Sequence, residues 1–261
     1  DFKVENKYEL VISLDDDAEA CKIASRVKCD KLIGAYMDGS NCKYTDEASG
    51  WFDMGLISKF GKQKADKFKA ANKMTYQNFL GKMLGVTIGR PILNVDSAED
   101  FRTKNHLTGK FVVGLNTGAG GRWKYKALGE EKTIEIIETL HEMGAKVILF
   151  GGPGETERNR RILSVSKHVI DAGCNNSLLE FASLIALCNV VISSDSLAMH
   201  IALALGKKVV VFFGPTSSAE IELYGLGEKV TSRMECLCCY KKDCNKKPNC
   251  MESIDVEEIM A

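Results

Sequence analysis

Between residues 110 and 214, short apolar runs rich in Val, Ile and Phe alternate with amphipathic stretches. Uninterrupted apolar runs suit strands that are buried on both faces, and strands that alternate with helices indicate βα units and a mostly parallel sheet. This pattern predicts an α/β fold. The expected strands are KFVVGLNTG (110–118), AKVILFGG (145–152), HVIDAG (168–173), NVVISS (189–194) and KKVVVFFG (207–214).

Four amphipathic stretches connect these strands and are expected to form helices. The first, EEKTIEIIETLHEMG (130–144), ends on a glycine, the residue that most often stops a helix. The spacing of its apolar residues predicts an inner face formed by Ile134, Ile136, Ile137 and Leu140. The other expected helices are ETERNRRILSVSK (155–167), SLLEFASLIALC (177–188) and LAMHIALALG (197–206).

The N-terminal part of the chain has a weaker pattern. Two expected strands, YELVISL (8–14) and CDKLIGAYM (29–37), flank the expected helix DAEACKIASRVK (17–28). An irregular stretch follows around residues 49–61, and a long helix is expected from about residue 66 to residue 84. With so few strands, this part is expected to be either a small, lopsided domain or the portion of one whose chain begins inside a longer protein.

A change of composition near residues 89–109 marks a linker between two domains. We predict an N-terminal domain over residues 1–95 and a C-terminal domain over residues 106–261, the latter with a cysteine-rich loop at 236–250. A chain of 261 residues with 45% hydrophobic residues can bury a sizeable core in domains of ordinary size.

Charge and hydropathy exclude several classes of protein. The 35 basic and 35 acidic residues cancel, so no global field attracts nucleic acid, and we expect no nucleic-acid partner. The longest apolar runs, such as KVVVFF (208–213), are too short to span a bilayer, and the first residues do not resemble a signal peptide. The sequence therefore predicts a cytoplasmic protein without a transmembrane segment.

The ten cysteines are unevenly distributed, because five of them lie between Cys236 and Cys250. Without a secretion signal, reduced thiols or metal ligands are favoured over a disulfide framework. The spacing of the quartet matches neither a zinc ribbon nor a ferredoxin motif, so we favour structural thiols and keep zinc or an iron–sulfur cluster as the alternative. That alternative would use Cys236, Cys239, Cys244 and Cys250.

The turn SSDSLAMH (193–200) carries the most informative polar cluster. Ser194, Asp195 and Ser196 lie where a strand ends and a helix begins, and ligands of open α/β sheets bind at such junctions. A phosphate or a set of sugar hydroxyls would suit this position. The alternative is that Asp195 or Ser196 only caps the helix. His200, one turn into the helix, is by itself more typical of a packed structural residue.

Three further strand ends have chemistry that is compatible with phosphate. LNTGAGGRWKYK (115–126) combines three glycines, which allow close approach of the backbone, with the cations Arg122, Lys124 and Lys126. FGGPGETE (150–157) is a glycine-rich turn, although it matches neither a P-loop nor GxGxxG. FFGPTSS (212–218) ends in a proline and three hydroxyls. Together these strand ends favour a nucleotide or nucleotide-sugar cleft.

The ordered segments NTGAGGRWKYK, VILFGGPGE, ISSDSLAMHIALALGKKVVVFFGPTSSAE and CLCCYKKDCNKKPNCM resemble glycosyltransferase family 9, the ADP-heptose:lipopolysaccharide heptosyltransferases. The resemblance covers residues 110–261 and extends more loosely over YELVISLDDDAEA and SGWFDMGLISKFG. It implies a GT-B architecture, with two Rossmann-like parallel-sheet domains of which the N-terminal one looks truncated. The C-terminal domain would hold the donor, and the N-terminal domain would face the acceptor.

The resemblance also implies roles for individual residues. Asp195 would bind hydroxyls of the donor sugar, Lys126 would neutralise the phosphates, and Ser196 with the N–H groups after it would face the diphosphate. Leu197 stands where the family usually has glycine, and Gly129 stands where proline is usual. The full set of implied substrate-binding residues is Thr117, Lys126, Gly151, Gly152, Asp195, Ser196, Leu197, His200 and Thr216.

The implied reaction transfers a heptose or related sugar from an ADP-sugar to a sugar hydroxyl of a lipopolysaccharide-type acceptor. In the family the reaction inverts the anomeric centre, uses a carboxylate base and requires no metal or other cofactor. The family's loop with the candidate base has no match in residues 1–30, so the general base is expected outside this chain, and Asp15, Asp16 and Asp17 are assigned to a helix start.

Two alternative functions stay open. A nucleotide-sugar epimerase or hydrolase would use the same scaffold, and a non-catalytic nucleotide-binding fragment would need no base. The expected acceptor is a lipid-linked saccharide, so peripheral contact at the inner face of the cytoplasmic membrane is expected. The lysines of the cysteine-rich loop are a solvated face or meet the phosphates of that acceptor, and they are Lys241, Lys242, Lys246 and Lys247.

Overall fold

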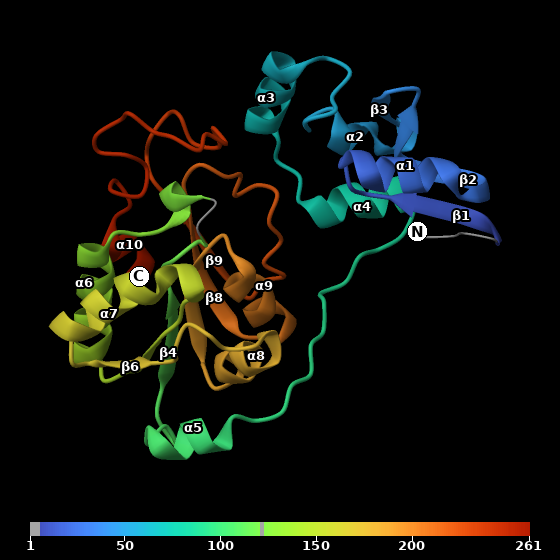
Figure 1. The fold of residues 1–261 in the computed structure, drawn as a ribbon. Coiled ribbons are helices and arrows are strands. Elements are labelled where there is room, and N and C mark those ends of the chain that lie inside the picture. Colours follow the sequence, from blue (N-terminus) through green and yellow to red (C-terminus); the bar gives the residue numbers. More distant parts are fainter. Residues whose placement is uncertain (1–5, 121–122) are drawn as a thin grey trace. The chain divides into compact units, whose positions relative to one another are not determined.

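The computed structural model describes residues 6–120 and 123–261, which form two compact units. The first unit extends to Gly89 and includes Ala219–Glu222; the second comprises Arg90–Ser218 and Leu223–Ala261 (Figure 1). Of the expected linker (89–109), Gly89 belongs to the first unit, and the residues from Arg90 on belong to the second. Arg90 Nη1 donates hydrogen bonds to the carbonyl oxygens of Leu203 and Ala204, at 2.7 and 2.9 Å. These bonds hold the segment against the end of a helix of that unit.

The first unit contains a three-stranded mixed sheet with the strand order β1-β2-β3. Strand β1 (Lys7–Ser13) is parallel to β2 (Lys28–Asp38), and helix α1 (Ala18–Arg26) connects them, as the sequence predicts. Strand β3 (Asn41–Tyr44) pairs antiparallel to β2 across a short turn. The sequence does not predict β3, because its residues, NCKY, lack the β-branched side chains that indicate a strand.

The expected long helix over residues 66–84 is wrong. Two helices, α3 (Lys62–Ala71) and α4 (Tyr76–Leu84), lie on either side of a break. At the break, the side chain of Asn72 bonds both the N–H and the carbonyl of Met74, each at 2.8 Å. This local turn competes with the helical hydrogen bonds, and Thr75 then caps α4 by accepting from Asn78 N.

The remaining helices of the first unit are short, and they surround a small core. They are η1 (Asp46–Ala48) and α2 (Ser49–Phe52), of which α2 lies at the start of the stretch that is expected to be irregular. The aspartates before α1 have the capping role that the sequence predicts, because Asp17 accepts hydrogen bonds from Glu19 N and Ala20 N. The buried core residues are Cys21, Ile33, Ala35, Ala48, Phe52 and Met83.

The second unit is built on a six-stranded sheet with the order β6-β5-β4-β7-β8-β9, in which every neighbouring pair is parallel. Five of these strands confirm the sequence-based expectation. The sixth, β9, was missed because its residues, GEKVT, are mostly polar and lie at the sheet edge. The strands are β4 (Val112–Asn116), β5 (Lys146–Leu149), β6 (Val169–Asp171), β7 (Val190–Ser194), β8 (Lys208–Phe213) and β9 (Gly227–Thr231).

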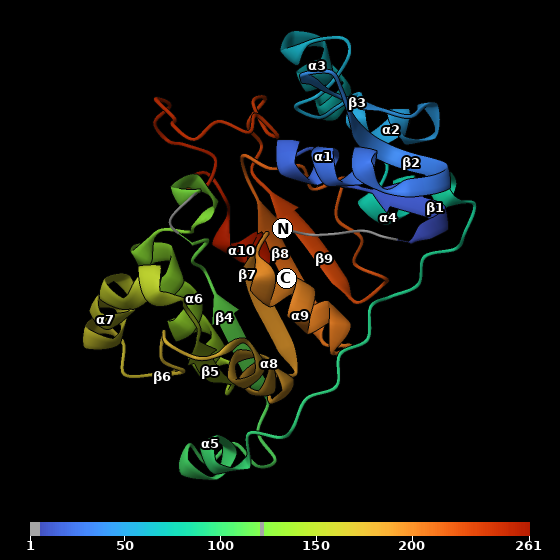
Figure 2. The same cartoon turned by 45° about the vertical axis from the view of Figure 1, so that its right-hand side comes forward.

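Helices cover both faces of this sheet (Figure 2). Helix α6 buries Ile136, Ile137 and Leu140, as predicted, while Ile134 is partly buried against the same core. The helices and helical turns of the unit are α5 (Glu99–Lys104), η2 (Lys124–Lys126), α6 (Glu130–Glu142), η3 (Pro153–Glu155), α7 (Thr156–Val165), α8 (Leu178–Ala186), α9 (Leu197–Ala204) and α10 (Val256–Met260).

The strand order creates a crevice at the centre of the sheet. The chain runs outward from β4 to β5 and β6, then returns to place β7 on the other side of β4. Asn116 at the end of β4 is thereby paired in register with Ser193 of β7. Open α/β sheets bind ligands where the strand order reverses in this way. The polar turns after β4 and β7 therefore meet at a position that suits ligand binding.

Within the described residues, no helix has the length and apolar character needed to cross a membrane.

Candidate functional site

A cavity of about 510 Å³ opens at the carboxyl ends of the central strands of the second unit. Its walls are the glycine-rich loops after β4 and β5, the loop before α8 and the first residues of α9. Cavities of this size, roughly 300–1,000 Å³, accommodate cofactors and other small molecules. Six of the predicted site residues line it: Lys126, Gly151, Gly152, Asp195, Ser196 and Leu197.

The charged centre of the cavity is an ion pair between two predicted site residues. Lys126 Nζ lies 2.9 Å from Asp195 Oδ2, and both side chains are largely withdrawn from solvent, with exposed fractions of 15% and 16%. The hydroxyl of Thr216 donates to the same Oδ2 at 2.8 Å. The turns after β4, β7 and β8 are therefore joined through one carboxylate oxygen, as expected if these strand ends form one site.

Ser196 occupies the N-cap position of α9, but its side chain makes no capping hydrogen bond. Its hydroxyl instead accepts from Asn116 Nδ2 at 3.1 Å and lies 3.0 Å from the hydroxyl of Ser193. This geometry contradicts the alternative that the serine only caps the helix. The first N–H groups of α9 have no side-chain cap, and Leu197 and Ala198 line the cavity there, which suits an anion.

Glu155 connects the two glycine-rich loops and was not singled out from the sequence. Its Oε1 accepts from Gly120 N and its Oε2 accepts from Gly152 N, both at 2.9 Å. A Cβ atom at Gly118 would lie 2.5 Å from Glu155 Cγ, and one at Gly151 would lie 2.6 Å from Asn159 Nδ2. Glycine is therefore required at both positions because the loops approach the start of α7 closely.

Thr117 lies behind the cavity wall. It is fully buried, and its hydroxyl accepts from Arg158 Nη2 at 2.7 Å and from Thr133 Oγ1 at 3.1 Å. The resemblance implies that Thr117 belongs to the donor loop; here its side chain anchors that loop to α6 and α7. A direct contact of Thr117 with the donor stays a prediction.

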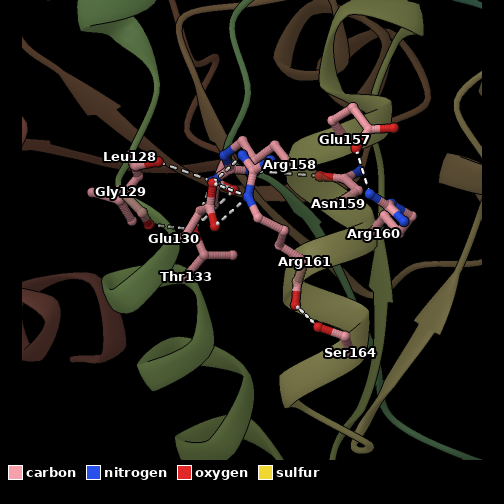
Figure 3. Close-up of polar contacts among 11 residues, drawn as sticks. Leu128, Gly129, Glu130, Thr133, Glu157, Arg158, Asn159, Arg160, Arg161 and Ser164 are labelled. Atoms are coloured by element: carbon pink, nitrogen blue, oxygen red, sulfur yellow. Dashed lines mark hydrogen bonds and ion pairs between the residues drawn. The ribbon is translucent and has the colours of Figure 1, made fainter.

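The guanidinium of Arg158 donates several of the hydrogen bonds that hold this loop in place. Besides Thr117, its Nη2 reaches Leu128 O and Thr133 Oγ1, both at 2.9 Å (Figure 3). Burial lowers the pKa of Arg158, and the carboxylates of Glu130 and Glu155 partly offset this effect. Arginine stays protonated in proteins, so Arg158 is a partly buried cation behind the loop after β4. Its segment, ETERNRR, has the composition of an exposed helix, so the sequence does not predict a structural role for Arg158.

His200 is in the first turns of α9 but is not among the residues that line the cavity. Desolvation by the surrounding protein lowers the pKa of its imidazole; Asp195 raises this pKa and Lys126 lowers it further. The neutral form of His200 is thus favoured. A role in binding stays a prediction.

Arg122 lies outside the described residues, and of Lys124 the structure describes only the backbone. Both cations were noted in the sequence of the loop after β4. Gly129 has φ −61° and ψ 157° at the N-cap of α6, a conformation that proline also adopts.

The cysteine-rich loop packs beside the site. Tyr125 donates from its hydroxyl to Cys244 O at 3.2 Å, and a Cβ atom at Gly214 would lie 2.7 Å from the sulfur of Cys250. Burial raises the pKa of Cys250, and the proximity of Cys239 raises it further. All ten cysteines lie in the described part of the chain, and none forms a disulfide there. Among those residues, no cluster of His, Cys, Asp and Glu is arranged to hold a metal ion, so the metal alternative stays unconfirmed.

The parallel sheet, its helices and the cavity at the carboxyl ends of its central strands define a Rossmann-like α/β protein. The sequence profile of glycosyltransferase family 9 (heptosyltransferase) matches residues 4–250. The chain therefore belongs to glycosyltransferase family 9, and the family resemblance is confirmed.

Similar curated proteins are lipopolysaccharide and lipooligosaccharide heptosyltransferases. Lipopolysaccharide heptosyltransferase 2 of Escherichia coli K12 is 30% identical over 112 residues, which cover 41% of this chain and 31% of the relative. Lipooligosaccharide heptosyltransferase 2 of Campylobacter jejuni (serotype O:6) is 28% identical over 162 residues, which cover 58% of this chain and 50% of the relative. The matched parts thus span a third to a half of the relatives' length.

Solved structures confirm the predicted fold class. A glycosyltransferase family 9 protein from Veillonella parvula has a TM-score of 0.56 at 20% identity, covering 70% of this chain and 56% of that one. E. coli heptosyltransferase WaaC with ADP has a TM-score of 0.54 at 18% identity, covering 98% of this chain and 71% of that one. These similarities establish the α/β fold of GT-B type; they carry no residue roles.

Proposed function

We propose that this protein is a glycosyltransferase that moves a heptose, or a related sugar, from an ADP-sugar to a sugar hydroxyl of a lipopolysaccharide-type acceptor. The observation that carries the proposal is the Lys126–Asp195 pair beside the uncapped start of α9 in one cavity. Membership in glycosyltransferase family 9 supports the sugar transfer. The names of the relatives support heptose and lipopolysaccharide, and the ADP in the WaaC structure supports the nucleotide.

The donor diphosphate would lie at the N-terminus of α9. The free N–H groups and the positive end of the helix dipole stabilise an anion there. An ammonium group carries three hydrogens, so Lys126 can keep one on Asp195 and offer another to a phosphate oxygen. In the transfer step, this cation and the helix end would stabilise the negative charge that develops on the departing diphosphate without a metal ion.

The donor sugar would lie against Asp195. Both polar contacts that the described residues make with this carboxylate, from Lys126 and Thr216, use Oδ2, so we assign Oδ1 as the acceptor for a sugar hydroxyl. Transfer with inversion also needs a base that takes the proton of the acceptor hydroxyl. No residue of this chain is assigned that role; Asp15 and Asp17 accept backbone hydrogen bonds in the turn before α1.

The proposed acceptor is a lipid-linked saccharide, which the protein would meet in peripheral contact with the inner face of the cytoplasmic membrane. In this proposal the cysteine-rich loop is a structural element near the donor cavity, and metal is not required for transfer.

A product assay tests the proposal. The protein is incubated with ADP-heptose, with and without a heptose-deficient lipopolysaccharide core, and with a chelator in a parallel sample. Mass spectrometry of the core should show the addition of one heptose, with release of ADP that depends on the acceptor and is unaffected by the chelator. Release of ADP without any acceptor would instead indicate a hydrolase, and an altered nucleotide sugar would indicate an epimerase; either result would contradict the proposal.

A further inference from the structure

The first unit carries a lysine-rich surface that the donor cavity does not explain. We define the α3 surface as residues 56–73, which comprise α3 and the loop before it. It contains six lysines and a single acidic residue, Asp66, although the whole chain has no net charge. Asp66 pairs with Lys62 at 3.1 Å, one turn away. The remaining positive charge is local and points to an anionic partner.

The same surface exposes large apolar side chains. Leu56 has an exposed fraction of 91%, Phe60 of 41% and Phe68 of 36%. The rings of Phe60 and Phe68 pack edge to face with their centroids 5.5 Å apart, and Lys64 Nζ lies 4.2 Å from the centroid of Phe60. Within α3 only Ala65 is buried. The core of the unit therefore holds little of this helix, and its apolar groups lie among cations.

We infer that the α3 surface docks the protein on the anionic face of a phospholipid bilayer. Interfacial helices combine lysines, which meet acidic headgroups, with Phe and Leu side chains that enter the boundary between headgroups and acyl chains. Lysine stems cover apolar surface while their ammonium groups reach the headgroups. A nucleic acid would use the lysines but leave Leu56 without a role. The inference rests on the proposed function only in that a lipid-linked acceptor would be presented on such a bilayer.

Sedimentation with vesicles tests this inference without any donor or acceptor. The full chain should sediment with vesicles of equimolar phosphatidylglycerol and phosphatidylcholine, should stay in solution with phosphatidylcholine alone, and should be released by high salt. The variant Lys62→Gln/Lys64→Gln/Lys67→Gln removes three exposed lysines while keeping good helix formers. Partitioning should weaken on the order of a hundredfold, since each lysine near an anionic surface contributes several-fold.

A matched control uses the other exposed lysine cluster. The variant Lys241→Gln/Lys242→Gln/Lys247→Gln removes the same charge from the cysteine-rich loop and should partition like the unaltered protein. A second variant, Leu56→Ser/Phe60→Ser, should weaken binding although it keeps every charge. Circular dichroism spectra should be the same for all variants.

Several results would overturn the inference. They are equal sedimentation with neutral and mixed vesicles, a loss of binding in the loop variant as large as in the α3 variant, and binding to duplex DNA but not to vesicles. Titration of ADP into the α3 variant separates this inference from the proposed function. Unchanged ADP binding with lost vesicle binding would support the docking surface independently of the donor site.

Discussion

The ammonium nitrogen of Lys126 lies 2.9 Å from Oδ2 of Asp195, and both side chains are mostly buried. Because the pair lines the cavity, a ligand that enters must share it or displace it. An anionic ligand would attract Lys126 and repel Asp195, whereas hydroxyls of a sugar would find an acceptor in Asp195. If the proposed function holds, the pair should therefore make a nucleotide sugar a better ligand than either of its halves.

Removing the cation should weaken both the fold and the ligand site. In Lys126→Met, Asp195 loses its charged partner in a poorly hydrated position, so the free energy of unfolding should fall by about 1–3 kcal/mol. Affinity for ADP should fall on the order of ten- to a hundredfold, because a charged hydrogen bond to phosphate is lost. Denaturant unfolding and calorimetry measure the two effects.

The control for this substitution is Lys146→Met. Lys146 is exposed at the amino end of β5, at the opposite edge of the sheet from the cavity. It should leave ADP affinity unchanged, and a similar loss in both variants would contradict a specific role for Lys126.

Arg158 should be more important than its polar sequence context suggests. In Arg158→Met, the hydroxyls of Thr117 and Thr133 and the carbonyl of Leu128 lose their charged donor, which should cost about 2–4 kcal/mol of unfolding free energy. Arg158→Lys should recover only part of this, since a lysine lacks the planar fork of the guanidinium. Arg160→Met, on the exposed side of the same helix, should cost less than about 0.5 kcal/mol in the same measurement.

Gly118, which lines the cavity, and Gly129, at the start of α6, should differ in their tolerance of a side chain. A methyl group at Gly118 would meet Glu155, which bridges the two glycine-rich loops, so Gly118→Ala should destabilise by about 1–3 kcal/mol and weaken nucleotide binding. Gly129 has no atom near its Cβ position and a φ that suits proline. Gly129→Pro should therefore raise stability by about 0.4–1 kcal/mol. Equal thermal unfolding of the two variants would contradict this distinction.

His200 should make the fold less stable in mild acid. Desolvation lowers the pKa of its imidazole below the value of the unfolded chain, so the unfolded state binds more protons between the two values. The contribution of His200 is therefore fully present above the unfolded pKa of about 6.5 and is lost as the pH falls through the lowered folded pKa. The effect should be small because His200 is exposed to solvent, which limits the desolvation of its imidazole.

Unfolding measured over this pH range in the native chain and in His200→Gln tests the prediction. The variant should lose less stability on acidification, and identical pH profiles would contradict the assignment.

The sequence predicts the central features of the fold and the site, and its misses have physical reasons. Continuous apolar runs identify the buried strands, and the polar residues that follow them identify Lys126, Asp195 and Ser196. The edge strand β9 and the hairpin strand β3 have no such signal, because pairing with a neighbour defines them more than their own composition does.

Residues that hold the loops of the cavity in place are harder to find. Glu155 and Arg158 belong to a polar stretch, and only the tertiary structure shows that Glu155 bonds loop N–H groups and that Arg158 bonds threonine hydroxyls. Thr117 was noticed as a loop residue, but its orientation depends on Arg158, which lies far from it in the sequence. Long-range hydrogen bonds of this kind do not produce a periodic pattern of residues in the sequence, so they cannot be predicted from it.

Calorimetric titration of ADP-heptose and of ADP into this chain, and into its Asp195→Ala variant, examines the proposed donor site most directly. If Asp195 holds the sugar, the native chain should bind ADP-heptose more tightly than ADP, and the variant should bind the two with similar affinity. Equal affinities in the native chain, or a preference for ADP-heptose that survives in Asp195→Ala, would contradict the assignment of the donor sugar to Asp195.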